Sequence, residues 1–134
     1  MSVKSSERKK TTVLDIQAMK ESGRKITMLS IPDYPMAILA DKAGLDTILV
    51  GDSLAMTVLG YESTVSVSLE EMLHHTKAVT RATKYAFVVG DMPFMSNTTS
   101  EREAIINAGR FMREGGTDSV KVEGGVNAAH TVKA

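Results

Sequence analysis

One pattern occurs twice in this chain: a run of apolar residues, then a glycine, then an aspartate. It reads ILVGDS at residues 48–53 and FVVGDM at residues 87–92. If each apolar run is a parallel strand, Asp52 and Asp91 lie at the carboxyl ends of two strands, where α/β proteins bind their ligands. The alternative is that each aspartate caps the turn after its strand. Ser53 follows the first aspartate, so the segment offers a nucleophile, a metal ligand or a simple turn.

A third segment, VKVEGG at residues 120–125, places two charges within an expected strand. Lys121 and Glu123 are two residues apart and therefore point to the same face of that strand. Charged groups in a parallel strand are costly unless they are paired or liganded. They could form an ion pair, or Lys121 could hold a substrate oxyanion while Glu123 supports a cation. Together with the two aspartates, Glu123 completes a set of oxygen ligands that suits Mg²⁺.

The letters GDSL at residues 51–54 also allow a serine-hydrolase interpretation. Esterases with this block need a histidine base, usually in an Asp-x-x-His arrangement late in the chain. His74, His75 and His130 all lack an aspartate three residues before them. A serine without its base is weak evidence for nucleophilic catalysis. We expect His75 to be a helix-surface or supporting residue.

Expected strands and helices alternate along the chain. Apolar, β-branched runs predict strands, and capping residues with helical spacing predict helices. The expected strands are 25–30, 47–51, 85–90 and 118–125, and the expected helices are 13–22, 34–43, 69–82 and 101–114, with capping boxes starting at Ser68 and Ser100. A long loop, 52–68, follows the second strand, and its length suggests a functional role.

This alternation predicts parallel strands joined by right-handed crossovers. The continuously apolar strands predict that both faces of the sheet are covered. Two α/β architectures fit: a small doubly wound sheet, or the first four units of a (βα)8 TIM barrel. A complete barrel needs about 250 residues, and this chain has 134.

The predicted organisation is a polar tail, residues 1–11, followed by the N-terminal half of a barrel, residues 12–134. A final helix starting near residue 126 reaches the last residue without a cap or a glycine. We therefore expect a truncated or partial chain that is incomplete at its C-terminus.

Composition excludes several classes of function. The formal net charge is zero, so no electrostatic case exists for a nucleic-acid or anionic-membrane partner. The chain has no cysteine, which excludes disulfides, thiolate nucleophiles and cysteine-based zinc sites. It has no apolar run of 18 residues that would span a membrane and no signal-peptide pattern. The expected location is the cytoplasm.

From about Lys25 to Gly125 the chain resembles the N-terminal half of the ketopantoate hydroxymethyltransferases. The resemblance rests on several motifs in the order and at the spacing of that family. They are DYP at 33–35, ILVGDSLAMTVLGYEST at 48–64, HHTKAVTRA at 74–82, VVGDMPFMS at 88–96 and VKVEGG at 120–125.

The resemblance implies a (βα)8 barrel of the phosphoenolpyruvate/pyruvate type and a homo-oligomeric enzyme. It implies Mg²⁺-dependent transfer of a hydroxymethyl group from 5,10-methylenetetrahydrofolate to 3-methyl-2-oxobutanoate, a small 2-oxo acid. The product is 2-dehydropantoate, in pantothenate (coenzyme A) biosynthesis.

The resemblance also implies roles for five residues. Asp52 and Asp91 would be metal ligands that also contact the substrate, and Glu123 a third carboxylate, direct or through water. Ser53 and Lys121 would hold the oxo acid. The base of the family is a glutamate on a later strand, beyond the last residue of this chain, so no catalytic residue is assigned.

Some positions depart from the family pattern. The residues before Asp33 read Ser-Ile-Pro instead of Thr-Ala-Tyr, Ala55 replaces a glycine, and His74 replaces a tyrosine. None is an implied metal ligand, but a positive φ at Ala55 would strain its turn. Two alternatives stay open: another Mg²⁺-dependent enzyme of this barrel superfamily, such as a C–C lyase, or a non-catalytic half-barrel fragment.

Overall fold

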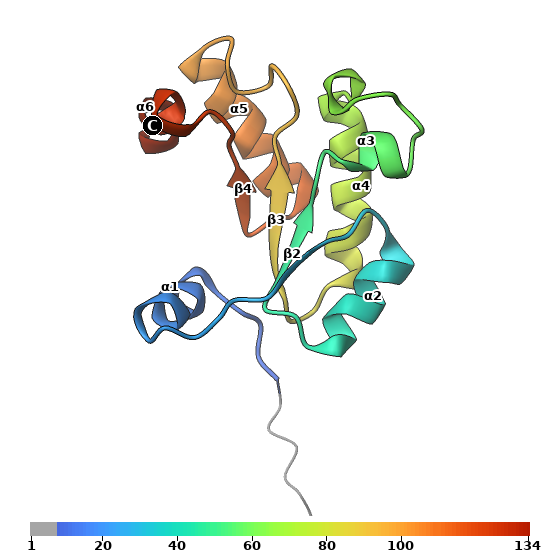
Figure 1. Cartoon of the computed structure of the whole chain (residues 1–134), viewed down its shortest axis with the longest axis vertical. Coiled ribbons are helices and arrows are strands. Elements are labelled where there is room, and N and C mark those ends of the chain that lie inside the picture. Colours follow the sequence, from blue (N-terminus) through green and yellow to red (C-terminus); the bar gives the residue numbers. More distant parts are fainter. Residues whose placement is uncertain (1–7) are drawn as a thin grey trace, which may run out of the picture.

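The computed structural model describes residues 8–134 and contains one parallel sheet (Figure 1). Its strands are β1 (Met28–Ser30), β2 (Thr47–Val50), β3 (Phe87–Asp91) and β4 (Ser119–Lys121), in the order β1-β2-β3-β4. A doubly wound sheet reverses its strand order at a switch point, whereas a barrel adds each strand beside the previous one. The order therefore decides between the two predicted architectures in favour of a partial (βα)8 barrel.

The four expected helices are all present. They are α1 (Val13–Glu21), α2 (Tyr34–Ala43), α4 (Leu69–Ala82) and α5 (Glu101–Arg110). Shorter helical segments complete the chain: α3 (Leu54–Thr57), η1 (Thr64–Ser66), the π-helical turn η2 (Phe111–Gly115), η3 (Gly125–Ala128) and α6 (Ala129–Lys133). Within residues 8–134, no helix has the length and apolar content needed to cross a membrane.

The two predicted capping boxes differ in the structure. Ser68 and Glu71 form the complete box, because the side chain of each accepts a hydrogen bond from the backbone N–H of the other. Ser100 accepts from the N–H of Glu103 at 3.1 Å, but the Glu103 carboxylate accepts from the Thr99 hydroxyl instead of returning to Ser100. The second box is therefore only half formed.

The outer strands are shorter than predicted, at 28–30 instead of 25–30 and 119–121 instead of 118–125. The reason is pairing: β1 and β4 are the two edges of the sheet and each has a ladder on one side only. After β4, Gly124 and Gly125 have φ values of 137° and 55°, which end the extended backbone.

Only one face of the sheet carries a packed core in the described residues. Ile48, Val50 and Val88 are fully buried with side chains of α2 and α4, and Figure 1 places these two helices beside the sheet. On the opposite face, Leu49 and Val89 are only half-buried. The prediction that both faces are covered is wrong for this part of the chain, because the second face is the interior side of an open barrel.

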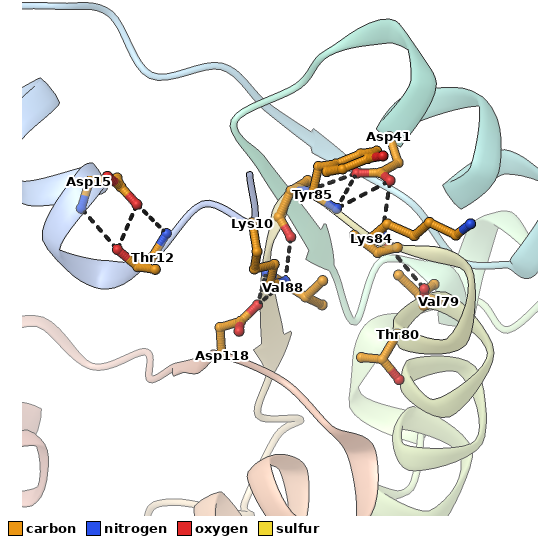
Figure 2. Close-up of polar contacts among 12 residues, drawn as sticks. Lys10, Thr12, Asp15, Asp41, Val79, Thr80, Lys84, Tyr85, Val88 and Asp118 are labelled. Atoms are coloured by element: carbon orange, nitrogen blue, oxygen red, sulfur yellow. Dashed lines mark hydrogen bonds and ion pairs between the residues drawn. The ribbon is translucent and has the colours of Figure 1, made fainter. Parts of the chain in front are cut away.

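Asp41 ties α2 to the start of β3, at the amino ends of the strands. Its carboxylate accepts hydrogen bonds from the backbone N–H groups of Lys84, Tyr85 and Ala86, at 2.9, 3.1 and 2.8 Å (Figure 2). Asp41 is buried, and backbone donors satisfy a buried carboxylate well. This end of the sheet is the stabilising end of a barrel.

Residues 8–11 are the described part of the predicted polar tail, and residues 1–7 lie outside the described residues. Lys10 donates to Asp118 and to the carbonyl of Ala86, both at 2.6 Å. The same Asp118 accepts from the backbone N–H of Val88 at 2.7 Å (Figure 2). The segment before α1 therefore contacts β3 near its amino end.

Candidate active site

Three of the predicted site residues meet at the carboxyl ends of neighbouring strands. Asp91 is the last residue of β3 and is in register with Lys121, the last residue of β4. Asp52 follows β2 by two residues. The end of the sheet opposite the Asp41 contacts thus gathers the polar side chains, as the repeated Gly-Asp pattern predicts.

Asp91 is the buried centre of this group, with 1% of its surface exposed. Lys121 Nζ donates to both of its carboxylate oxygens, at 2.7 and 2.8 Å. The backbone N–H of Asp52 donates to Oδ2 of Asp91 at 3.0 Å. Such partners are what a charged carboxylate requires away from water.

The environment of Asp52, unlike that of Asp91, disfavours the charged form of its carboxyl group. Burial raises the pKa of its carboxyl above the usual range, and the negative charge of Asp91 raises it further. The positive charge of Lys121 and a hydrogen bond from Thr64 act in the other direction but do not cancel the effect. A cation placed between the two aspartates would favour the charged form of Asp52.

Glu123 lies on the far side of the Lys121 ammonium group. Its Oε1 is 2.7 Å from Lys121 Nζ, and its side chain is 68% exposed. Burial lowers the pKa of Lys121, but hydrogen bonds to Asp91 and Glu123 outweigh this, so the pKa is raised above the usual value. The ion pair considered from the sequence is therefore present, and Lys121 also holds Asp91.

The three carboxylates do not converge. Within residues 8–134, no group of three or more His, Cys, Asp or Glu side chains is placed to hold a metal ion. Asp52 and Asp91 do lie on neighbouring strand ends, and the pKa of Asp52 is raised mainly by burial and further by the charge of Asp91. Two carboxylates completed by water and substrate oxygens fit the way in which Mg²⁺ is usually bound.

Ser53 begins the short helix α3, and its side chain makes no capping hydrogen bond. A Cβ atom built on Gly51 would lie 3.2 Å from Ser53 Oγ and 2.8 Å from Ser30 Oγ. Both hydroxyls therefore border the same point above Gly51. Ser30 was not identified from the sequence, and the only signal for it is its position at the end of the first expected strand.

The histidines take structural positions. His75 Nδ1 is 2.7 Å from the carbonyl oxygen of Pro32, and His74 meets the ring of His75 edge-on. His130 pairs with Glu101 at 2.6 Å. No hydrogen bond joins any of the three to Ser53 in the described part of the chain, which supports rejecting the hydrolase interpretation.

Ala55 also has a simple structural account. It is fully buried within α3, and Met95 is the only described non-glycine residue with positive φ. The strain considered for Ala55 is therefore absent.

Parallel strands in chain order, with acidic and basic side chains at their carboxyl ends, form part of a (βα)8 barrel with a candidate ligand site. The family model described as ketopantoate hydroxymethyltransferase matches residues 10–134. The chain belongs to this family, and the resemblance read from the motifs is confirmed.

Curated relatives carry the name 3-methyl-2-oxobutanoate hydroxymethyltransferase. The protein of Moorella thermoacetica is 56% identical over 129 residues, covering 96% of this chain and 48% of the relative. That of Clostridium botulinum strain Langeland is 57% identical over 125 residues, covering 93% of the chain and 46% of the relative. The chain thus spans about half the length of the curated relatives it matches.

Solved structures confirm the fold. Phosphoenolpyruvate phosphomutase from Streptomyces platensis subsp. rosaceus aligns with a TM-score of 0.65 at 16% identity, covering 81% of this chain and 37% of that one. A 2,3-dimethylmalate lyase of the PEP mutase/isocitrate lyase superfamily aligns with a TM-score of 0.64 at 17% identity, covering 92% and 41%. Phosphonopyruvate hydrolase, solved in complex with oxalate and Mg²⁺, gives 0.63 at 16% identity, covering 75% and 34%.

Proposed function

We propose that this chain is the metal- and oxo-acid-binding half of a barrel that transfers a hydroxymethyl group. The donor is 5,10-methylenetetrahydrofolate, the acceptor is 3-methyl-2-oxobutanoate, and the product is 2-dehydropantoate, a precursor of pantothenate. The family membership supports this activity. The observation that carries the site is the pair Asp52 and Asp91, adjacent at two strand ends, with Asp91 bound to Lys121.

Asp52 and Asp91 would hold Mg²⁺, with Glu123 contributing through water because its side chain points outward. Bound there, the ion would supply a Lewis acid for the keto oxygen of the substrate. Lys121 would offer its ammonium group to the negative charge of the oxo acid. Ser53, with a hydroxyl that caps nothing, would donate a hydrogen bond to the same substrate.

The proton at C3 of the oxo acid needs a base, and Glu71 is poorly suited to that role. One of its oxygens accepts from the Tyr61 hydroxyl and the other from Ser68. These hydrogen bonds lower the pKa of Glu71 to about 2, far below the range that serves a general base near neutral pH. The family resemblance implies a glutamate base on a later strand, and we propose that this base lies in the second half of the barrel.

The remaining expectations belong to the same proposal. The partners are a small 2-oxo acid and a folate, and neither nucleic acid nor a membrane is a partner. The enzyme works in the cytoplasm as a homo-oligomer. These points depend on the family and on the composition of the chain.

Reconstitution tests this function against the lyase alternative. The chain is mixed with the C-terminal half of the M. thermoacetica relative, and 2-dehydropantoate is measured with Mg²⁺, oxo acid and 5,10-methylenetetrahydrofolate. Product that requires both the folate and Mg²⁺, and that disappears with Asp91→Asn, supports the proposal. A mixture that cleaves a C–C bond of a hydroxy acid and ignores the folate contradicts it.

A further inference from the structure

The chain after β4 extends beyond the last paired residues of the sheet. The β3–β4 ladder ends at the pair Asp91 and Lys121, and the backbone N–H of Met92 still donates to the carbonyl of Lys121 at 3.2 Å. Hydrogen bonds of a parallel ladder are evenly spaced, so the next acceptor on this side of the chain is the carbonyl of Glu123. Strand β3 has already ended at Asp91, so this carbonyl lies beyond the ladder.

The side chain of Asn97 supplies the donor that the strand does not. Its Nδ2 donates to the carbonyl of Glu123 at 3.0 Å, and Asn97 is only 8% exposed. The loop before it turns at residues 93–96, where the N–H and the hydroxyl of Ser96 both donate to the carbonyl of Pro93. Asn97 thus adds one hydrogen bond between the two chain segments after the backbone of β3 has turned away.

The fold itself holds Asn97 in place. Asn107 of α5 is buried and donates to the carbonyl of Ser96 at 2.8 Å, which fixes the residue before Asn97. Met95 has a φ of 65° and is the only described non-glycine residue with positive φ. Such a conformation persists only where surrounding contacts impose it. The position of the Asn97 amide is therefore determined by the loop and by α5.

The other contacts at Glu123 hold its backbone only weakly. The ion pair with Lys121, at 2.7 Å, directs the Glu123 carboxylate, but the side chain is 68% exposed, and exposed ion pairs add little stability. Gly124 and Gly125 follow directly, with φ values of 137° and 55°, and glycine leaves the chain much conformational freedom. The hydrogen bond from Asn97 is therefore the contact that fixes the backbone at Glu123.

We propose that Asn97 is a positioning residue that holds the backbone of Glu123, so that the Glu123 carboxylate stays beside Lys121 and available to a cation at Asp52 and Asp91. Asn97 acts through Glu123 and contacts neither metal nor substrate. This inference rests on the proposed function, in which Glu123 contributes to Mg²⁺ binding through water. It adds to that function a residue on the loop after β3.

A double-mutant cycle on the 134-residue chain tests this role, with Mg²⁺ affinity measured by calorimetry. Asn97→Ala should weaken Mg²⁺ binding about fivefold, less than the roughly tenfold loss expected for Glu123→Gln, since outer-shell partners contribute about 10–100-fold. In the Glu123→Gln background, Asn97→Ala should cause no further loss, because the effects of residues that act through one another are not additive. Asn97→Leu, which is close to asparagine in size but has no donor, should reproduce the result of Asn97→Ala.

A purely structural role for Asn97 gives a different result, because Mg²⁺ affinity would then change equally in both backgrounds. Asn127→Ala is the matched control, since Asn127 is an exposed asparagine four residues after Glu123, and it should bind Mg²⁺ as the unaltered chain does. Unaltered Mg²⁺ affinity in Asn97→Ala, or equal losses with and without the Glu123 carboxylate, overturns the inference. Failure of the proposed function is a separate outcome: Mg²⁺ affinity that is insensitive to both Asp52→Asn and Asp91→Asn.

Discussion

At the scale of single residues, the two aspartates balance their charge differently. Asp91 is neutralised by Lys121 and by a backbone donor, whereas Asp52 has a raised pKa because it is partly buried beside Asp91. Two carboxylates therefore share this site with a single ammonium group, Lys121, which also pairs with Glu123. An added divalent cation is the simplest way to complete it.

Removing the charge of either aspartate should weaken the binding of Mg²⁺. We expect Asp52→Asn and Asp91→Asn each to reduce Mg²⁺ affinity by at least about tenfold, judged from the 10–100-fold losses seen even for outer-shell ligand partners. Calorimetric titration of the purified variants measures the loss. Asp33→Asn is the control, because Asp33 caps α2 and asparagine caps a helix equally well. Unaltered affinity in both site variants would remove these residues from the metal site.

The raised pKa of Asp52 predicts a pH effect on stability. A carboxyl whose folded pKa lies above its unfolded pKa binds more protons in the folded state, so stability falls as pH rises between the two values. Asp52→Asn removes this titration. Without Mg²⁺, it should be more stable than the unaltered chain at neutral pH, and the difference should shrink below the ordinary aspartate pKa. Urea unfolding at both pH values measures this, and a gain that grows on acidification would contradict it.

Lys121 should matter more for the oxo acid than for the metal. Its ammonium group holds Asp91, and a cation near Mg²⁺ serves an anion. We expect Lys121→Ala to weaken oxo-acid binding about tenfold or more, as for a lost charge-assisted contact, while Mg²⁺ affinity does not fall. NMR titration of the acid and calorimetry of the metal separate the two. Equal loss of both would favour a purely structural ion pair with Glu123.

At the scale of elements, one end of the sheet carries the candidate site and the other end carries stabilising contacts. The carboxyl ends of β2, β3 and β4 bring together Asp52, Asp91 and Lys121. At the amino ends, Asp41 of α2 binds three successive backbone N–H groups that lead into β3. Site and stabilising contacts are thereby separated along the strands.

Loss of the Asp41 contacts should cost stability and leave the site intact. Asp41→Ala leaves three backbone donors without their buried acceptor, and we expect about 3 kcal/mol of destabilisation from this. Urea denaturation measures it, and Mg²⁺ titration under folded conditions should give the affinity of the unaltered chain. A variant of unchanged stability with weakened Mg²⁺ binding would contradict the division between the two ends.

The repeated Gly-Asp pattern was sufficient to predict that Asp52 and Asp91 lie at the carboxyl ends of neighbouring strands. Helices 34–43 and 69–82 were likewise predictable from their capping residues. The position of Ser30 was not predictable, because an exposed serine has no pattern, and its approach to Gly51 arises only when β1 pairs with β2. The outward position of Glu123 depends on its ion pair with Lys121, which spacing alone cannot distinguish from metal ligation.

At the scale of the whole molecule, the sheet has two open edges, β1 and β4, in the described residues. Apolar side chains remain exposed beside them, among them Met28 and Leu29 on β1. A groove of about 780 Å³ next to β4 is lined by Ile105, Met112 and Val132. A closed barrel has no such edges, and its second half would cover these surfaces.

The 134-residue chain alone should therefore self-associate. The contacts would be strand edges and apolar surfaces, so the association should persist at high salt, unlike one based on surface charge. Sedimentation velocity over a range of concentrations and salt measures it. Addition of the C-terminal half of the M. thermoacetica relative should replace self-association with a one-to-one complex. A chain that stays monomeric at all concentrations would contradict this expectation.

We propose that this chain binds the metal and the oxo acid but lacks the base. The most direct measurement is exchange of the C3 proton of 3-methyl-2-oxobutanoate into heavy water, followed by NMR with Mg²⁺. We predict background exchange with the chain alone, clear exchange after addition of the C-terminal half of the M. thermoacetica relative, and loss of that exchange with Asp91→Asn. Clear exchange catalysed by the isolated chain would contradict this proposal and would place the base among its own residues, with Glu71, His74 and His75 the first to replace.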